Sequence, residues 1–175
     1  MPVLLRDDDD IAASINCIVS DVDGVMTDGS IVYDNHGVET KRFHVRDGLG
    51  IKLWMRSGFG FGILTSRSSD IVTKRSAELG ISHVRQGVQE KLSASTELLE
   101  SLGYPPEQVC YIGDDLPDLP VMKSVALAVS PADAAIDVRE NSHWILRSRG
   151  GDGAVRELVE RLLRAKYRWE EHTTC

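Results

Sequence analysis

The sequence of 175 residues has few of the features that mark secreted, membrane-spanning or nucleic-acid-binding proteins. It contains three cysteines, an odd number with no CxxC spacing, so neither a disulfide framework nor a zinc site is expected. No apolar run approaches the ~20 residues of a membrane span, and no secretion signal is visible. The formal net charge is −7, which lacks the basic footprint of a nucleic-acid-binding protein. We therefore expect a cytoplasmic protein without a nucleic-acid or membrane partner.

The scarce cysteines and the acidic N-terminal segment have simple interpretations. Cys17 and Cys110 lie in apolar, strand-like runs and are expected to pack as small hydrophobic residues in the core. Cys175 is expected to be exposed. The run Asp7 to Asp10 indicates a solvated, flexible lead-in over residues 1–14 rather than a cation site.

The arrangement of apolar segments predicts the fold class. No repeat or linker divides the chain, so we expect a single domain over 1–175. Buried strands are predicted at 15–20, 59–64, 109–112, 126–129 and 143–146, with helices near 49–57, 69–79, 90–102 and 119–123 and a C-terminal helix and tail over 154–175. Such alternation is typical of an α/β protein with a doubly wound (Rossmann-like) parallel sheet and helices on both faces. Alternating residues around Asp34-Asn35-His36-Gly37 predict a projecting β-hairpin over 30–43.

Polar side chains follow three of the predicted strands. Asp21 and Asp23 follow the first, Thr65 the second, and Asp114 the third. The carboxyl ends of parallel strands meet at one edge of a sheet, where ligands bind in this fold class. Lys91, in the loop before the helix that begins near residue 90, supplies a positive charge to the same edge. Crowded carboxylates favour a hard divalent cation, so Mg²⁺ is the predicted cofactor.

This set of groups suits phosphoryl transfer. A carboxylate placed in line with a phosphoryl group can attack it and form an aspartyl-phosphate. A second carboxylate two residues further on can protonate the leaving oxygen and then activate water. A lysine and a metal ion neutralise charge on the transferred oxygens.

Four motifs in order resemble those of the haloacid dehalogenase-like hydrolase superfamily. They are Asp21-Val22-Asp23-Gly24-Val25, Thr65, Lys91 and Gly113-Asp114-Asp115-Leu116-Pro117-Asp118. The resemblance implies that Asp21 is the nucleophile and a metal ligand, Asp23 the general acid/base and a ligand through its carbonyl, and Asp114 the second metal carboxylate. It implies that Thr65 binds a phosphoryl oxygen and Lys91 balances charge. Asp115 and Asp118 would support the metal from outside its ligand shell.

The gaps between the motifs indicate a branch of this superfamily without a cap domain, because Asp23 and Thr65 are separated only by a hairpin and one helix. The stretches 44–51, 86–87 and 150–157 resemble capless, tetrameric members that hydrolyse an eight-carbon keto-sugar acid phosphate in lipopolysaccharide synthesis. The resemblance implies a homotetramer joined through the hairpin and a tail that reaches a neighbouring site. It implies substrate contacts from His44, Val45, Arg46, Asp47, Gly48, Lys52, Arg67, Arg75 and Lys91.

Departures from that pattern leave alternatives open. His44 stands where asparagine is usual, and Asp152 stands where arginine is frequent, which removes positive charge near the predicted anionic site. A nine-carbon keto-sugar acid phosphate is therefore an alternative substrate, and a non-catalytic oligomerisation module of the same fold is a third hypothesis. Asp47 could instead be a helix cap, and Arg67 and Arg75 could be exposed helix charges.

Overall fold

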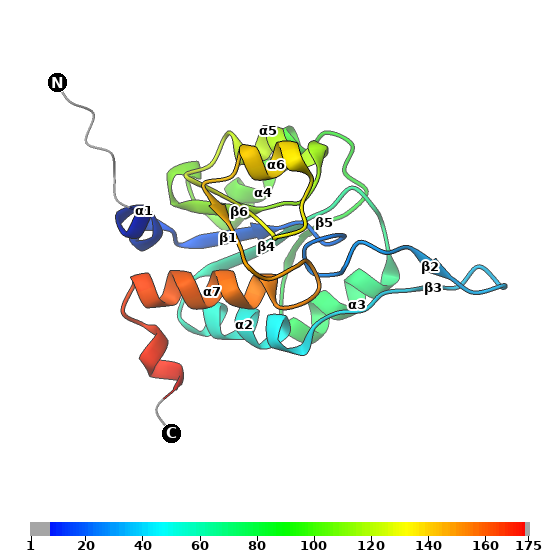
Figure 1. Ribbon diagram of the computed structural model, residues 1–175, viewed down its shortest axis with the longest axis horizontal. Helices are drawn as coiled ribbons and strands as arrows, with labels where there is room; N and C mark the ends of the chain where they lie inside the picture. The colour runs from blue at the N-terminus through cyan, green and yellow to red at the C-terminus, as the bar shows by residue number, and fades with distance from the viewer. Residues whose placement is uncertain (1–7, 174–175) are drawn as a thin grey trace.

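The computed structural model describes residues 8–173 and places a six-stranded parallel sheet at the centre, in the order β5-β4-β1-β6-β7-β8 (Figure 1). The strands are β1 (Cys17–Ser20), β4 (Gly60–Leu64), β5 (His83–Arg85), β6 (Val109–Ile112), β7 (Leu127–Ser130) and β8 (Trp144–Ile145). The chain builds β4 and β5 on one side of β1 and then crosses to place β6 on the other. The strand order therefore reverses beside β1, where ligands bind in open α/β sheets.

Helices cover both faces of the sheet (Figure 1). One face carries α2 (Val45–Arg56), α3 (Asp70–Leu79) and α7 (Ala154–Ala165), and the other carries α4 (Lys91–Leu102), α5 (Leu119–Met122) and α6 (Ile136–Glu140). Alternate residues of β1 enter different cores: Ile18 packs with α2 and α7, while Cys17 and Val19 pack with α4 and α5. The predicted doubly wound fold class and the burial of the two described cysteines are confirmed.

The hairpin is present but shorter than predicted. Its strands are β2 (Val32–Tyr33) and β3 (Glu39–Thr40), and it projects from the body of the molecule (Figure 1). The Asp34 carboxylate closes the turn by accepting hydrogen bonds from the backbone N–H groups of His36 (2.8 Å) and Val38 (2.9 Å). Only the hairpin and α2 separate β1 from β4, so this part of the described chain contains no cap domain.

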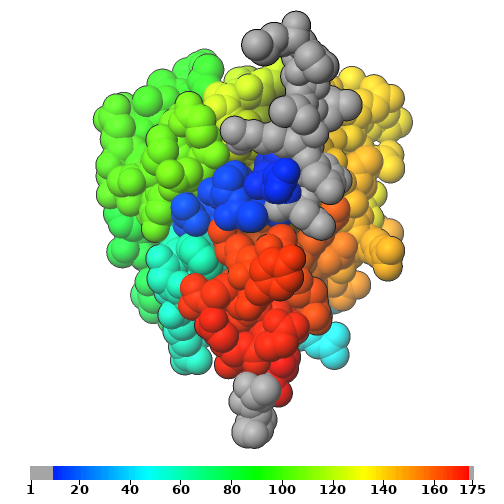
Figure 2. All heavy atoms as spheres, turned by 90° about the vertical axis from the view of Figure 1, so that its left-hand side faces the viewer, coloured from blue at the N-terminus to red at the C-terminus, as the bar shows by residue number. Residues whose placement is uncertain are grey.

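The N-terminal prediction was wrong over the described residues. Residues 8–14 form α1 (Asp8–Ser14) rather than a flexible lead-in, because Ala12 and Ile15 bury their side chains in the core. Acidic residues in the first turn of a helix also interact favourably with its dipole. Helix α1 lies against α7, where Lys166 Nζ donates to the Ala13 carbonyl at 2.7 Å (Figure 2). Asp7 and Cys175 lie outside the described residues.

Other differences are local. Strand β5 and helix α6 were not predicted, because both are short and carry charged residues. Helix α2 begins at Val45, several residues earlier than expected, and α7 ends at Ala165. Three 3₁₀ turns, Pro106–Gln108, Leu116–Asp118 and Trp169–His172, complete the described secondary structure. Every helix within residues 8–173 is too short or too polar to cross a lipid bilayer.

Candidate active site

A polar cavity of about 240 Å³ opens at the carboxyl ends of β1, β4 and β6. Asp21, Thr65 and Asp114, which follow these three strands, all line it together with Lys91. The prediction that the strand ends place these side chains at one edge of the sheet is therefore correct.

Asp21 lies at the floor of this cavity, with only 7% of its surface exposed. Its backbone N–H continues the β1–β6 ladder by donating to the Ile112 carbonyl at 3.0 Å. The carboxylate is oriented at both oxygens: Oδ1 accepts from the backbone N–H of Val22 at 2.7 Å, and Oδ2 lies 3.1 Å from Lys91 Nζ. These contacts hold the carboxylate in a fixed position, as a nucleophile requires.

Lys91 is the first residue of α4, with Glu90 as the N-cap, and is not in the preceding loop as predicted. Its side chain is buried and its Nζ also lies 2.6 Å from Asp118 Oδ1. Burial opposes a charged amine, but Asp21 and Asp118 outweigh it and raise the pKa of Lys91 above its usual value. Lys91 therefore remains a cation between two carboxylates.

Asp118 holds the surroundings of the site in place. Its Oδ1 accepts hydrogen bonds from Lys91 and from the Tyr111 hydroxyl, each at 2.6 Å. Its Oδ2 accepts the backbone N–H groups of Asp114 (3.0 Å) and Asp115 (3.2 Å). With both oxygens engaged in this way, Asp118 fits the supporting role implied by the resemblance better than the role of a metal ligand.

The same region has the donor set of a divalent-cation site. Asp21, Asp114 and Asp118 offer carboxylate oxygens within 4.8 Å of one another. Asp114 Oδ1 is buried and has no hydrogen-bond partner among the described residues. Burial is the main cause, and repulsion from Asp21 the next, of a pKa of Asp114 that is raised to about 8. The pKa of Asp21 is raised to about 6, mainly by burial and then by repulsion from Asp118. A hard cation would offset the cost of burying these ionised carboxylates close together, so Asp21 and Asp114 fit Mg²⁺.

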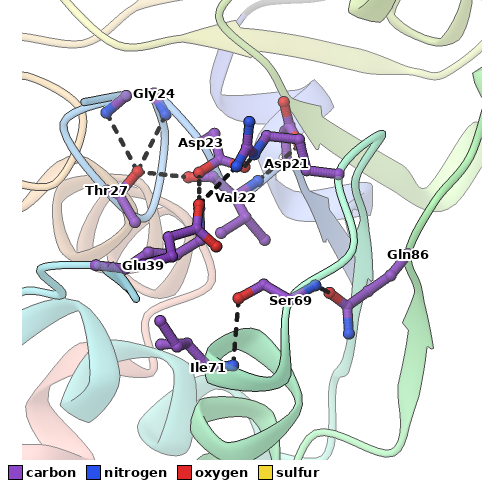
Figure 3. A network of polar contacts seen from close by, with 12 residues as sticks. Asp21, Val22, Asp23, Gly24, Thr27, Glu39, Ser69, Ile71 and Gln86 are labelled. Carbon is purple, nitrogen blue, oxygen red and sulfur yellow. Dashed lines mark hydrogen bonds and ion pairs between the residues drawn. The ribbon is translucent and has the colours of Figure 1, made fainter. Parts of the chain in front are cut away.

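The turn after β1 places Asp23 at the rim of the cavity. The Thr27 hydroxyl lies within this turn and accepts the backbone N–H groups of Gly24 (3.4 Å) and Gly29 (3.2 Å) (Figure 3). On its outer side, Gly151 donates its N–H to the Val25 carbonyl at 2.9 Å. The turn that carries Asp23 is thus held from within and from the loop before α7.

Two charged residues of the hairpin reach the site and were not predicted. Lys41 forms an ion pair with Asp23 Oδ1, and Glu39 Oε1 accepts from Arg67 Nη2 at 2.6 Å. In Figure 3 the side chain of Glu39 lies beside Asp23. No local sequence signal links Lys41 to Asp23, because the hairpin turn separates them.

The predicted substrate residues divide into two groups. Arg67 and Lys91 line the cavity, whereas the residues near the start of α2, together with Lys52 and Arg75, do not line it within the described chain. Val45 is 79% exposed, and Arg75 packs over the Phe43 ring and against Gly48. Their contact with substrate remains a prediction.

Asp47 has a structural role in the described chain. It is only 2% exposed, and its Oδ1 accepts the backbone N–H of Arg156 at 2.8 Å, in the first turn of α7. Burial raises its pKa. Asp47 therefore caps a helix, as the alternative interpretation allowed, but the helix is α7 rather than its own.

His44 and Arg46 line a separate cavity of about 700 Å³, together with Asp152 and Arg156. His44 is the N-cap of α2 and accepts the backbone N–H of Arg46 at 3.2 Å. Its Nε2 lies 3.8 Å from Asp152 Oδ1, so the unusual residues at 44 and 152 are neighbours.

Comparison with known proteins agrees with the class that this fold and site define. The family model described as haloacid dehalogenase-like hydrolase matches residues 63–158. The 3-deoxy-D-manno-octulosonate 8-phosphate phosphatase of Yersinia pestis is 46% identical over 162 residues, covering 93% of this chain and 87% of that protein.

Two solved structures are also similar. The 3-deoxy-D-manno-octulosonate 8-phosphate phosphatase of Moraxella catarrhalis, in complex with a magnesium ion, a phosphate ion and KDO, is 40% identical with a TM-score of 0.91, covering 94% of this chain and 95% of that one. The cobalt-bound phosphatase of Haemophilus influenzae is 39% identical with a TM-score of 0.90, covering 94% and 96%. The chain therefore belongs to the haloacid dehalogenase-like hydrolases and, within them, to the family of the 3-deoxy-D-manno-octulosonate 8-phosphate phosphatases.

Proposed function

We propose that this chain is a Mg²⁺-dependent phosphatase that hydrolyses 3-deoxy-D-manno-octulosonate 8-phosphate to the free sugar acid and phosphate. The observation that carries the proposal is the fixed Asp21 carboxylate, 3.1 Å from the buried Lys91 amine and beside Asp114. The activity named for the Yersinia pestis relative and the ligands of the Moraxella catarrhalis structure support the same chemistry.

In the first step a carboxylate oxygen of Asp21 attacks phosphorus and the ester P–O bond breaks. The leaving oxygen takes a proton from Asp23, and Thr65 and Lys91 bind the transferred oxygens. In the second step Asp23 takes a proton from water, which attacks phosphorus and releases phosphate from Asp21. Asp21, Asp114 and the Asp23 carbonyl would hold Mg²⁺, which when bound neutralises phosphoryl charge.

The substrate assignment is tested by phosphate release from a panel of sugar phosphates, with Mg²⁺ and with a chelator. The panel contains the eight-carbon acid phosphate, a nine-carbon keto-acid phosphate and simple hexose phosphates. We expect the highest kcat/KM for the eight-carbon acid. Preference for the nine-carbon acid would retain the phosphatase chemistry but overturn the substrate assignment. The observation that favours this second candidate is the position of Asp152 beside His44. No release from any compound would support the non-catalytic module.

The proposal includes a homotetramer joined through the hairpin. The hairpin exposes four large apolar side chains: 54% of Ile31, 50% of Val32, 56% of Tyr33 and 56% of Val38. Exposed apolar residues that cluster in this way are typical of an interface between protein chains. Size-exclusion chromatography with light scattering should give four times the chain mass for the wild type and a smaller species for Val32→Asp. A monomeric wild type would contradict this part of the proposal.

The proposal also places the reaction in the cytoplasm, as a step of lipopolysaccharide synthesis. Cys17 and Cys110 are buried free thiols, which fits a reducing compartment. Fractionation of cells that produce the chain, followed by detection with an antibody, tests the location: recovery with periplasmic proteins would contradict it.

A further inference from the structure

The side chain of Lys41 is buried beside the active site although the residue comes from the base of the hairpin. It follows β3 directly, and only 2% of the side chain is exposed. A buried ammonium group is costly unless it is paired and hydrogen-bonded. Its partners are Asp23 Oδ1, by a short ion pair, and Glu39 Oε1 at 3.5 Å.

Lys41 acts on only one oxygen of the Asp23 carboxylate. Asp23 Oδ2 is buried and has no hydrogen-bond partner among the described residues. Arg67 Nε lies 3.9 Å from this oxygen and is likewise without a hydrogen-bond partner among the described residues. One oxygen of Asp23 is therefore anchored by an ion pair, while the other makes no hydrogen bond within the described chain.

Glu39 holds the two cations of this cluster in place. Its Oε1 accepts from Arg67 Nη2 at 2.6 Å and lies near Lys41 Nζ. Glu39 comes from β3, Asp23 from the turn after β1, and Arg67 from the segment after β4. Figure 3 shows Glu39 reaching from the hairpin toward Asp23. The hairpin base thus forms part of the wall around Asp23.

Lys41 is too deeply placed to bind substrate directly. The cavity at the strand ends is lined by Asp23 and Arg67 but, among the described residues, not by Lys41. A cation that touches the carboxylate from behind restricts its rotation without entering the cavity. A positioned acid must lie within hydrogen-bond reach of the oxygen that it protonates, so this restriction bears on the rate.

We propose that Lys41 is a positioning residue that anchors Oδ1 of Asp23 and so aims Oδ2 at the leaving oxygen of the phosphate ester. This inference rests on the acid role given to Asp23 in the proposed function. In the step concerned, the ester P–O bond breaks, the electron pair stays on the leaving oxygen, and that oxygen takes the proton from Oδ2. Lys41 keeps its own protons throughout.

Leaving-group dependence of kcat/KM separates this role from a general loss of structure. Because kcat/KM reports the steps through the first irreversible one, the release of a poor leaving group is sensitive to proton donation. A good leaving group such as 4-nitrophenolate departs without a proton. A merely misfolded fraction would lower the rates with all substrates by the same factor.

The experiment measures kcat/KM in Mg²⁺ for Lys41→Met with a series of phosphate monoesters, from 4-nitrophenyl phosphate to phenyl and alkyl phosphates. We expect a loss of about 100-fold with alkyl phosphates and under about threefold with 4-nitrophenyl phosphate. Asp23→Asn is the positive control and should show the same bias more strongly. Lys123→Met, an exposed lysine distant from the cavity, is the matched control and should match the wild type.

If Lys41→Met does not fold, the same series of esters is measured with Lys41→Gln, which keeps an N–H donor. The dependence of the loss in kcat/KM on the leaving group then tests the role of Lys41. An equal loss of kcat/KM across all leaving groups, or no loss, would overturn the positioning role of Lys41. The proposed function would still stand in that case, provided that the wild type is active. Absence of bias in Asp23→Asn would instead overturn the acid role of Asp23. An inactive wild type would overturn the proposed function itself.

Discussion

The backbone of Gly24 lies directly against the carboxylate of Asp114. A Cβ added at Gly24 would come within 2.0 Å of Asp114 Oδ2, closer than any non-bonded contact allows. Gly24 also has a φ of +90°, a conformation that other residues adopt at a cost. The motif Asp21-Val22-Asp23-Gly24 thus needs glycine at its fourth position in order to bring the turn after β1 close to the carboxylate that follows β6.

Gly24→Ala should therefore displace Asp114 and weaken metal binding. We expect the Mg²⁺ concentration for half-maximal activity to rise by about tenfold or more, because a change that disturbs the orientation of a metal ligand typically costs about 10–100-fold in metal affinity. A Mg²⁺ titration of phosphate release measures it. Gly80→Ala is the matched control, since Gly80 has a similar φ of +80° but nothing within 4 Å of the added Cβ. An equal effect of the two variants would show that backbone strain alone is responsible.

The raised pKa of Asp114 predicts a pH-dependent stability in the absence of metal. Its folded-state pKa is about 8 against an ordinary value of 3.8, so the folded protein binds the extra proton between these values. Its contribution to stability is fully present below pH 3.8 and is lost as pH rises through about 8. Asp21, with a pKa of about 6, adds to the same loss between 3.8 and 6.

Without metal, Asp114→Asn should therefore melt above the wild type at pH 8, by roughly 2–4 °C for each kcal/mol relieved, and close to it at pH 4. Added Mg²⁺ should raise the melting temperature of the wild type, more at pH 8 than at pH 5, and should not raise that of Asp114→Asn. Scanning fluorimetry in both conditions measures this. A variant less stable than the metal-free wild type at pH 8 would contradict the assigned repulsion.

Lys91→Met should be costly to both rate and stability. The change leaves Asp21 and Asp118 without their shared cation, and removal of one partner from a buried pair costs about 3–5 kcal/mol. The loss of unfolding free energy should be smaller at pH 5, where Asp21, whose pKa is raised to about 6, binds a proton. We also expect kcat/KM to fall by at least about 100-fold. Urea denaturation and phosphate release measure the two effects, with Lys74→Met on the exposed face of α3 as the control.

Asp47→Ala should lower stability because it removes the cap of α7. Loss of a helix cap costs about 1–2 kcal/mol, and Asp47→Asn, which keeps Oδ1 as an acceptor for Arg156, should cost less. Urea denaturation measures the difference between the variants. A large rise in KM with unchanged stability would instead support the predicted substrate contact.

The sequence was sufficient to predict the site where residues follow strongly apolar strands. Asp21, Thr65 and Asp114 were found because each lies within two residues of the end of a buried strand, and parallel strands bring their carboxyl ends together. The family and the fold class are confirmed by the sheet order and the relatives. Helix α3 (Asp70–Leu79) also forms close to its predicted range of 69–79, with Ser69 capping its start and Gly80 ending it in the left-handed conformation.

The remaining features depend on contacts between segments that are distant in the sequence. Lys41 reaches Asp23 only because the hairpin folds back on the turn after β1, and Asp47 caps a helix that begins more than a hundred residues later. Strand β5, His83–Arg85, has polar residues at two of its three paired positions and only Val84 is apolar, so tertiary contacts with β4 decide its conformation. The assigned roles of the site residues remain predictions.

The most direct test of the account is to trap the phosphorylated enzyme. Wild-type protein is mixed with 3-deoxy-D-manno-octulosonate 8-phosphate and Mg²⁺, quenched rapidly in acid, and mapped by peptide mass spectrometry. The account predicts a phosphoryl group on Asp21, and an Asp21→Asn variant with neither the modification nor phosphate release. Turnover by Asp21→Asn at the wild-type rate, or a phosphoryl group on another residue, would contradict it.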